Sequence, residues 1–87
     1  MTREERIRDI LTKSFAPETL DVQDDSHRHA GHAGARPEGE THYTVHIIAS
    51  VFTGDTRVAM QRKVMDALAL EFETGLHALS IKAKAAG

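Results

Sequence analysis

The sequence predicts an α+β fold, with helices covering one face of a three-stranded mixed sheet. Three short segments alternate apolar and polar residues and indicate strands, whereas two longer segments repeat apolar residues at helical spacing. Their order along the chain is α-β-β-α-β. Because a helix separates the second and third strands, these two strands are expected to pair in parallel. The 87 residues allow one domain, expected over 1–87, with a single thin core.

The first helix is expected to begin at a capping box. Thr2 and Glu5 have the spacing at which each side chain satisfies a backbone N–H that the first turn leaves free. An apolar stripe follows at helical spacing, consisting of Ile7, Ile10, Leu11 and Phe15. Pro17 then ends the helix, because proline cannot continue the hydrogen-bond ladder.

A short strand and a long loop are expected next. Leu20 and Val22 share one face of the strand, which ends at Asp24–Asp25. Residues 26–40 contain three Gly, one Pro, three His and no large apolar residue. Such a segment cannot pack a core, so it is expected to form a flexible loop.

The second strand, over 41–52, is the most regular alternating segment of the chain. It places Tyr43, Val45 and Ile47 toward the core and should form an antiparallel hairpin with the first strand.

The second helix is expected to follow the turn Thr53-Gly54-Asp55, which also offers an N-cap. Its apolar face contains Val64, Met65, Leu68 and Phe72, joined by Val58 if the helix is continuous, and Gly75 is expected to end it. His77 should begin the third strand, with Leu79 and Ile81 facing the core, and residues 83–87 are expected to be a frayed tail.

The composition excludes several classes of protein. Eleven Lys and Arg against thirteen Asp and Glu give a net charge of −2, whereas nucleic-acid-binding domains usually carry a basic excess. The chain has no cysteine, which excludes a disulfide scaffold and a self-sufficient all-cysteine iron–sulfur site. No apolar run approaches the roughly 18 residues of a membrane span, and residues 1–10 contain no secretory apolar region. A soluble cytoplasmic protein with no membrane partner is expected.

None of the common catalytic motifs occurs in the sequence. It has no G-x-S-x-G elbow, no phosphate-binding G-x-G-x-x-G or P-loop, and no H-E-x-x-H zinc motif. Asp24, Asp25, Ser26 and His27 are the residue types of a hydrolase triad, but adjacency in sequence is not triad geometry. We therefore do not expect an enzyme.

Histidine is the most informative residue type, because six of the 87 residues are His. His27, His29 and His32 form an H-x-H-x2-H pattern in the predicted loop, and imidazoles at this spacing can converge on one transition metal. The alternative is a solvated polar loop without a fixed ligand.

The other three histidines lie on predicted strands. His77 is in phase with Leu79 and Ile81, so strand parity places it at the rim of the helix-covered face. It is either a half-buried structural histidine or a ligand held on a rigid strand end. His42 and His46 lie on the opposite face of the second strand and are expected to be exposed.

Five basic residues are expected to make a modest patch near the second helix and third strand: Arg57, Arg62, Lys63, Lys82 and Lys84. The aromatic residues are mostly needed by the core, so platforms for stacking bases are lacking. No G-x-x-G clamp, as a K-homology domain needs, lies between helices.

Four segments in order, DDSHRHAGH, GETHYTV, FTG and LHALSI, resemble the BolA family. The resemblance covers the chain from Ile7 to Ile81, and the motifs are specific in combination. It implies a class II K-homology-like topology that lacks the G-x-x-G clamp. This topology agrees with the order of elements predicted from the residues.

The resemblance implies a protein that pairs with a monothiol glutaredoxin and shares a [2Fe–2S] cluster with it, the glutathione being supplied with the partner. The strand-start histidine of the family corresponds to His77. The second ligand comes from the variable loop, and the matching position here is His29, with His27 and His32 as fallback ligands. A homodimer of the free chain is a further expectation.

The alternative function is that of a DNA-binding transcriptional regulator of stress response and cell morphology, a label the same family carries. Arg57, Arg62 and Lys63 would then contact the nucleic acid. The family commonly has Arg-His-Arg early in the second helix, whereas this sequence has Met60-Gln61-Arg62, so the resemblance implies no role for that first Arg and His here. The cluster function is favoured, because affinity for DNA would have to come from the few basic side chains of a net negative domain and would fall steeply with salt. Two imidazoles cannot complete a two-iron cluster, so a partner must supply the thiolates.

Overall fold

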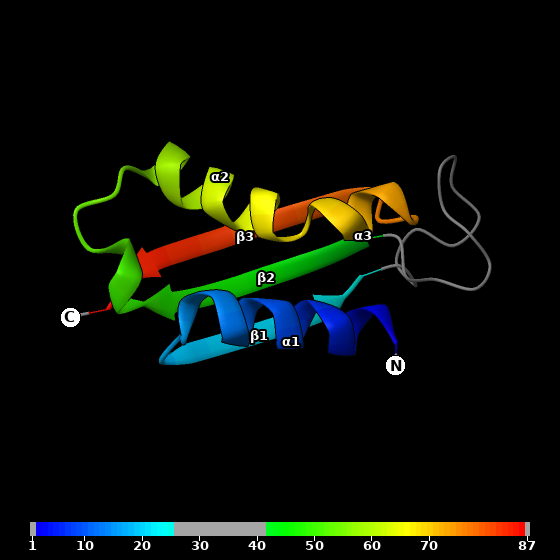
Figure 1. The fold of residues 1–87 in the computed structure, drawn as a ribbon, viewed down its shortest axis with the longest axis horizontal. Helices are drawn as coiled ribbons and strands as arrows, with labels where there is room; N and C mark the ends of the chain where they lie inside the picture. The colour runs from blue at the N-terminus through cyan, green and yellow to red at the C-terminus, as the bar shows by residue number, and fades with distance from the viewer. Residues whose placement is uncertain (1, 26–41, 87) are drawn as a thin grey trace.

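The computed structural model describes residues 2–25 and 42–86 and has the expected α+β architecture (Figure 1). The elements in chain order are α1 (Arg3–Phe15), β1 (Thr19–Asp24), β2 (His42–Ala49), the 3-10 helix η2 (Ser50–Phe52), α2 (Arg57–Ala67), α3 (Ala69–Glu73) and β3 (Ala78–Ala85). No helix among the described residues is long and apolar enough to cross a bilayer. The predicted loop over 26–40 lies outside the described residues.

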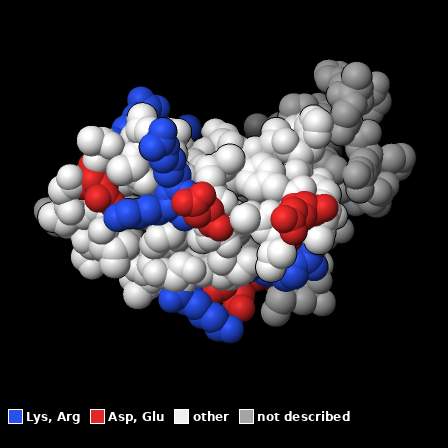
Figure 2. Space-filling view, turned by 45° about the horizontal axis from the view of Figure 1, so that its top comes forward, with Lys and Arg blue, Asp and Glu red and all other residues white. Residues whose placement is uncertain are grey.

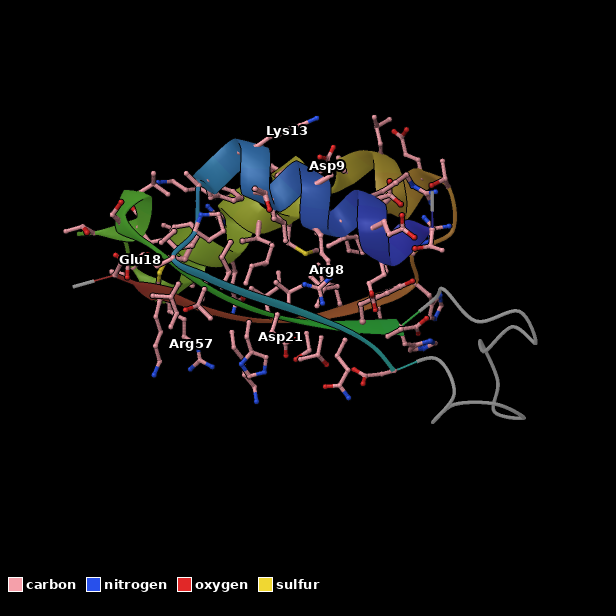
Figure 3. The ribbon with its side chains drawn as sticks, turned by 90° about the horizontal axis from the view of Figure 1, so that it is seen from below. Arg8, Asp9, Lys13, Glu18, Asp21 and Arg57 are labelled. Carbon is pink, nitrogen blue, oxygen red and sulfur yellow. The ribbon has the colours of Figure 1, made fainter. Side chains whose placement is uncertain are left out.

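The three strands form one mixed sheet in the order β1-β2-β3. β1 pairs antiparallel with β2, and β2 pairs in parallel with β3, as the intervening helix predicted. The helices lie together on one side of the sheet, and no helix among the described residues covers its other face (Figure 3). Along the sheet, α1 lies over β1 and β2, while α2 and α3 follow β3 (Figure 1).

Helix caps set the start of both long helices. The Thr2 hydroxyl accepts a hydrogen bond of 3.2 Å from the backbone N–H of Glu5, which confirms the predicted N-cap of α1. Thr56 caps α2 by accepting from the backbone N–H of Ala59 at 3.1 Å. The cap of α2 therefore follows the predicted turn instead of lying within it, and Gly54 supplies the positive φ of 85° that the turn requires.

The core lies between the helices and the covered face of the sheet. Its buried apolar residues are Ile7, Leu11, Phe15, Val22, Tyr43, Val45, Ile47, Ala49, Phe52, Val64, Leu68 and Leu76. The apolar stripe predicted for α1 and the inward face of β2 are thus confirmed. Phe72, Leu79 and Ile81 are only partly buried against this core. For Leu79 and Ile81 the reason is that β3 is an edge strand, with a neighbour on one side only.

The second helix is divided in two, contrary to the continuous helix that would include Val58 and Phe72. The division lies at the fully buried Leu68, whose backbone N–H is shared between the carbonyls of Val64 at 3.2 Å and Met65 at 3.1 Å. Such shared bonds are common where a helix ends. The apolar periodicity continues across the division, so periodicity alone did not reveal it.

The frayed tail predicted for 83–87 is wrong for most of its length. β3 continues to Ala85, and its last three residues pair in parallel with Ile47, Ile48 and Ala49. The backbone N–H of Ala86 also donates to the carbonyl of Ala49 at 3.1 Å. Backbone pairing with a central strand orders this segment although its small and charged side chains add little packing.

A buried ion pair, invisible to pattern analysis, fastens the start of α1 to the end of α3. Arg3 Nη1 lies 2.8 Å from Glu71 Oε1, and both side chains are less than a tenth exposed, at 9% and 6%. Arg6 Nε approaches Glu71 Oε2 at 3.0 Å. The guanidinium of Arg3 also donates to the hydroxyl and the carbonyl of Thr74, each at 3.0 Å. Together these bonds hold the turn that leads into β3.

Truncation of the core at Leu68 should destabilise the protein strongly. We expect Leu68→Ala to lower the free energy of unfolding by about 2–5 kcal/mol in urea denaturation, because it opens a cavity under α2. Leu70→Ala is the matched control, since Leu70 is 68% exposed and its loss should change stability by no more than about 0.5 kcal/mol. Equal costs for the two variants would contradict the observed burial.

Loss of the buried carboxylate should be costlier than loss of an exposed one. Glu71→Ala should lower the free energy of unfolding by about 3–5 kcal/mol, because it leaves the buried Arg3 guanidinium without its counter-charge. Asp9→Ala breaks the exposed Asp9–Lys13 pair, in which the nitrogen and oxygen are 3.1 Å apart, and should cost no more than about 1 kcal/mol. A cost below about 1 kcal/mol for Glu71→Ala would show that the buried pair does not hold the two elements.

Candidate functional site

His77 is exposed at the point where the chain enters β3. The residue before it, Leu76, is buried at 4% exposure and donates its backbone N–H to the carbonyl of Glu71 at 2.8 Å. Gly75 makes the turn with a φ of 134°, a conformation that favours glycine. The backbone on both sides of His77 is therefore fixed, while its imidazole is accessible.

His77 makes a contact that the sequence did not predict. The strand ladder begins at Ala78, so His77 directly precedes β3. The His77 ring contacts the ring of His42, with centroids 5.4 Å apart and planes inclined at 52°. Parallel pairing explains this contact, because His42 is the first residue of β2 and pairs with Ala78. His42 is half-buried, less exposed than expected, whereas His46 is exposed.

The two ends of the segment 26–41 meet at the same end of the sheet. The backbone N–H of Asp25 donates to the carbonyl of His42 at 2.8 Å. The hydroxyl of Thr44 donates a hydrogen bond to the Asp25 carboxylate. Asp25, His42 and Thr44 also line an open hollow of about 260 Å³ beside the start of β3. This end of the sheet thus combines two imidazoles, one fixed carboxylate and the attachment points of the histidine-rich segment.

The predicted loop ligands His27, His29 and His32 lie outside the described residues, so their relation to His77 stays a prediction. Within residues 2–25 and 42–86, no group of three or more His, Cys, Asp or Glu is arranged to hold a metal ion. The described part of the site therefore offers His77 and His42 only. Their contact was not predicted from the sequence, because it depends on the register of the parallel pair.

A groove between α2 and β3 forms a second candidate site, with a volume of about 370 Å³. Arg57, Lys82 and Lys84 contribute its charged lining, and Met60 and Ile81 contribute apolar surface. Gln61 lines it as well, so both positions at which this sequence departs from the expected Arg-His-Arg pattern, Met60 and Gln61, face the groove.

The three predicted nucleic-acid contacts do not form one basic cluster. Arg57 lines the groove and Arg62 is exposed elsewhere on α2. Lys63 Nζ is 2.6 Å from Asp55 Oδ2, so a carboxylate already neutralises its charge. Figure 2 shows basic side chains gathered near α2 with acidic ones interspersed. The surface here is of mixed sign.

Comparison with known proteins gives consistent matches. The BolA-like protein family model matches residues 11–87. SufE-like protein 1, chloroplastic/mitochondrial, of Arabidopsis thaliana is 45% identical over 83 residues, which are 91% of this chain and 22% of that protein. The DNA-binding transcriptional regulator BolA of Escherichia coli (strain K12) is 36% identical over 77 residues, covering 88% of this chain and 70% of the regulator.

The fold has a close counterpart among solved structures. The BolA domain of SufE1 from Arabidopsis thaliana superposes with a TM-score of 0.87 at 42% identity, covering 98% of this chain and 93% of that domain. The chain thus spans about a fifth of SufE-like protein 1 but nearly all of its solved domain.

Proposed function

The chain belongs to the BolA-like protein family, and on that premise we propose that it pairs with a monothiol glutaredoxin and shares a glutathione-bound [2Fe–2S] cluster with it. The proposal is that of a binding module acting in iron–sulfur cluster trafficking and iron and redox regulation, not of an enzyme, and its expected place of action is the cytoplasm. The observation that carries it is the exposed His77 imidazole on a fixed backbone, at the end of the sheet where the histidine-rich segment begins and ends.

The donor set of the chain fits a shared cluster. A [2Fe–2S] cluster needs four ligands, usually thiolates, and histidine replaces two of them on one iron in Rieske centres. This chain contains six His and no Cys. It can therefore supply imidazoles, while the thiolates must come from the partner and its glutathione. The proposed ligand from the rigid part of the fold is His77.

The proposed second ligand is His29, with His27 and His32 as substitutes. His29 lies four positions after Asp25, and an extended chain spans at most about 3.6 Å per residue, so the reach from Asp25 is about 14 Å. The backbone hydrogen bond between Asp25 and His42 fixes that starting point at the end of the sheet where His77 lies. Imidazole ligation raises the reduction potential of such a cluster relative to ligation by cysteine alone.

Removal of the fixed imidazole tests this proposal. His77→Ala should abolish the change in the visible spectrum that accompanies mixing with a cluster-loaded monothiol glutaredoxin, and should leave the fold intact because His77 is exposed. His46→Ala, which removes an exposed histidine from the face of β2 that no described helix covers, should leave that change as in the unaltered chain. Circular dichroism of each variant checks the fold.

The outcomes separate the two ligand positions. His29→Ala should reduce the spectral change less than His77→Ala does, because neighbouring histidines in the same segment can replace it. If His77→Ala gives a mixed complex with an unaltered cluster spectrum, His77 is a structural histidine and the proposed ligation is wrong.

Binding to duplex DNA is the second candidate function, and one observation favours it. The groove between α2 and β3 is lined by Arg57, Lys82 and Lys84, and the Escherichia coli relative is named as a DNA-binding transcriptional regulator. Against it stand the net charge of −2 and the pairing of Lys63 with Asp55. Affinity that rests on so few cations would fall steeply with salt.

The DNA function makes a distinct prediction about the groove. If it is correct, duplex binding should persist at about 0.15 M salt. Arg57→Ala and Lys84→Ala should each weaken it and reduce the slope of log affinity against log salt by about 1. Lys13→Ala is the control, because Lys13 is exposed on α1, away from the groove. Binding that is absent at this salt concentration, or equally affected by all three changes, would remove the DNA function.

A further inference from the structure

The contact between His42 and His77 is built into the backbone pairing of the sheet. His42 begins β2, and His77 immediately precedes Ala78, the partner of His42 in the parallel ladder. Their ring centroids are 5.4 Å apart and the planes are inclined at 52°. The backbone pairing of neighbouring strands therefore brings the two residues to the same end of the sheet.

This separation is the one expected for two imidazoles on a single metal ion. A ring nitrogen lies about 2.0–2.1 Å from a bound Zn²⁺, and the ring centre lies about 1 Å further out. At a tetrahedral angle, two such rings have their centres about 5 Å apart. An ordinary aromatic contact also occurs at about 4.5–7 Å, so the surroundings must distinguish the two interpretations.

The surroundings favour a metal site. His77 is exposed and His42 lines an open hollow of about 260 Å³, so an ion in water can reach the pair. Asp25 lines the same hollow, with its carboxylate fixed by the Thr44 hydroxyl. A carboxylate that lines the same hollow as His42 adds negative charge that attracts a cation, and nearby carboxylates commonly orient histidine ligands.

We infer that His42 and His77 form a two-imidazole site in the free chain for one divalent first-row transition-metal ion. Imidazole suits Zn²⁺, Cu²⁺, Fe²⁺ and Ni²⁺ alike. The described residues supply no third ligand, so the remaining coordination positions take water or a donor from another molecule. Structural zinc sites are closed by four protein ligands, whereas this open arrangement is typical of an ion that exchanges.

One consequence rests on the proposed function. An ion held between His42 and His77 occupies the imidazole that the shared cluster is proposed to use. Zn²⁺ should therefore suppress the spectral change seen with a cluster-loaded glutaredoxin. His42→Ala should relieve this suppression, because it weakens Zn²⁺ binding and leaves His77 in place.

Titration of the whole chain with Co²⁺ alone tests the site without any partner. Co²⁺ reports nitrogen ligation by its visible absorption, and Zn²⁺ should displace it. His42→Ala and His77→Ala should each weaken Co²⁺ binding by about tenfold or more, since even groups that only orient ligands contribute this much. His46→Ala should bind Co²⁺ like the unaltered chain, and so should a variant with alanine at positions 27, 29 and 32.

Three results would contradict the proposed metal site. No Co²⁺ binding, unaltered binding by His42→Ala, or loss of binding in the variant altered at 27, 29 and 32 would overturn the inference and leave the two rings as a packing contact. Should His42→Ala fail to fold, His42→Gln decides, because it keeps a polar side chain at this half-buried position. The Co²⁺ titration needs no glutaredoxin. The metal site can therefore be confirmed even if the cluster proposal fails, and the cluster proposal can be confirmed even if the metal site fails.

Discussion

The parallel pairing of β2 with β3 is the constraint on which the other elements depend. Parallel neighbours need a crossover, and here α2 and α3 make it on the same side of the sheet as α1. That arrangement places all the described helices on one face. It also brings the starts of both strands to one end, so His42 and His77 meet although 34 residues separate them in the sequence. The antiparallel β1 brings Asp25 to the same end.

A second constraint fixes the turn that precedes β3. Arg3 and Arg6 surround the Glu71 carboxylate, and Arg3 also holds the hydroxyl and carbonyl of Thr74. A buried ion pair adds little net stability compared with apolar packing, but removal of one partner is costly. Its effect here is geometric, because Thr74, Gly75 and the buried Leu76 lead directly to His77. The exposed His77 imidazole is thus attached to a backbone that buried contacts hold in place.

The sequence predicted the fold well because the fold follows from local patterns. Period-two alternation identified β2, and the helix between strands predicted its parallel partner. The order of β3 up to Ala85 came from backbone pairing, which small residues such as Ala83 do not reveal. The Arg3–Glu71 pair joins residues 68 apart, and a charged residue in an amphipathic helix is usually assigned to solvent. The pattern placed His77 at the start of β3, its proposed ligand role came from the family resemblance, and the contact with His42 required the register.

The two candidate sites differ in the kind of interaction they can make, and therefore in how far salt weakens it. The groove carries Arg57, Lys82 and Lys84 on a domain of net charge −2, so its attraction for a polyanion is partly cancelled by the rest of the surface. The imidazole pair depends instead on coordination bonds, which salt screens far less than attraction between exposed charges. A chain with six His and no Cys can supply imidazole ligands to a metal ion or cluster but no thiolate ligands. A site that lacks ligands would hold a stored metal poorly. When a partner supplies the missing ligands, the metal or cluster binds only in the presence of that partner.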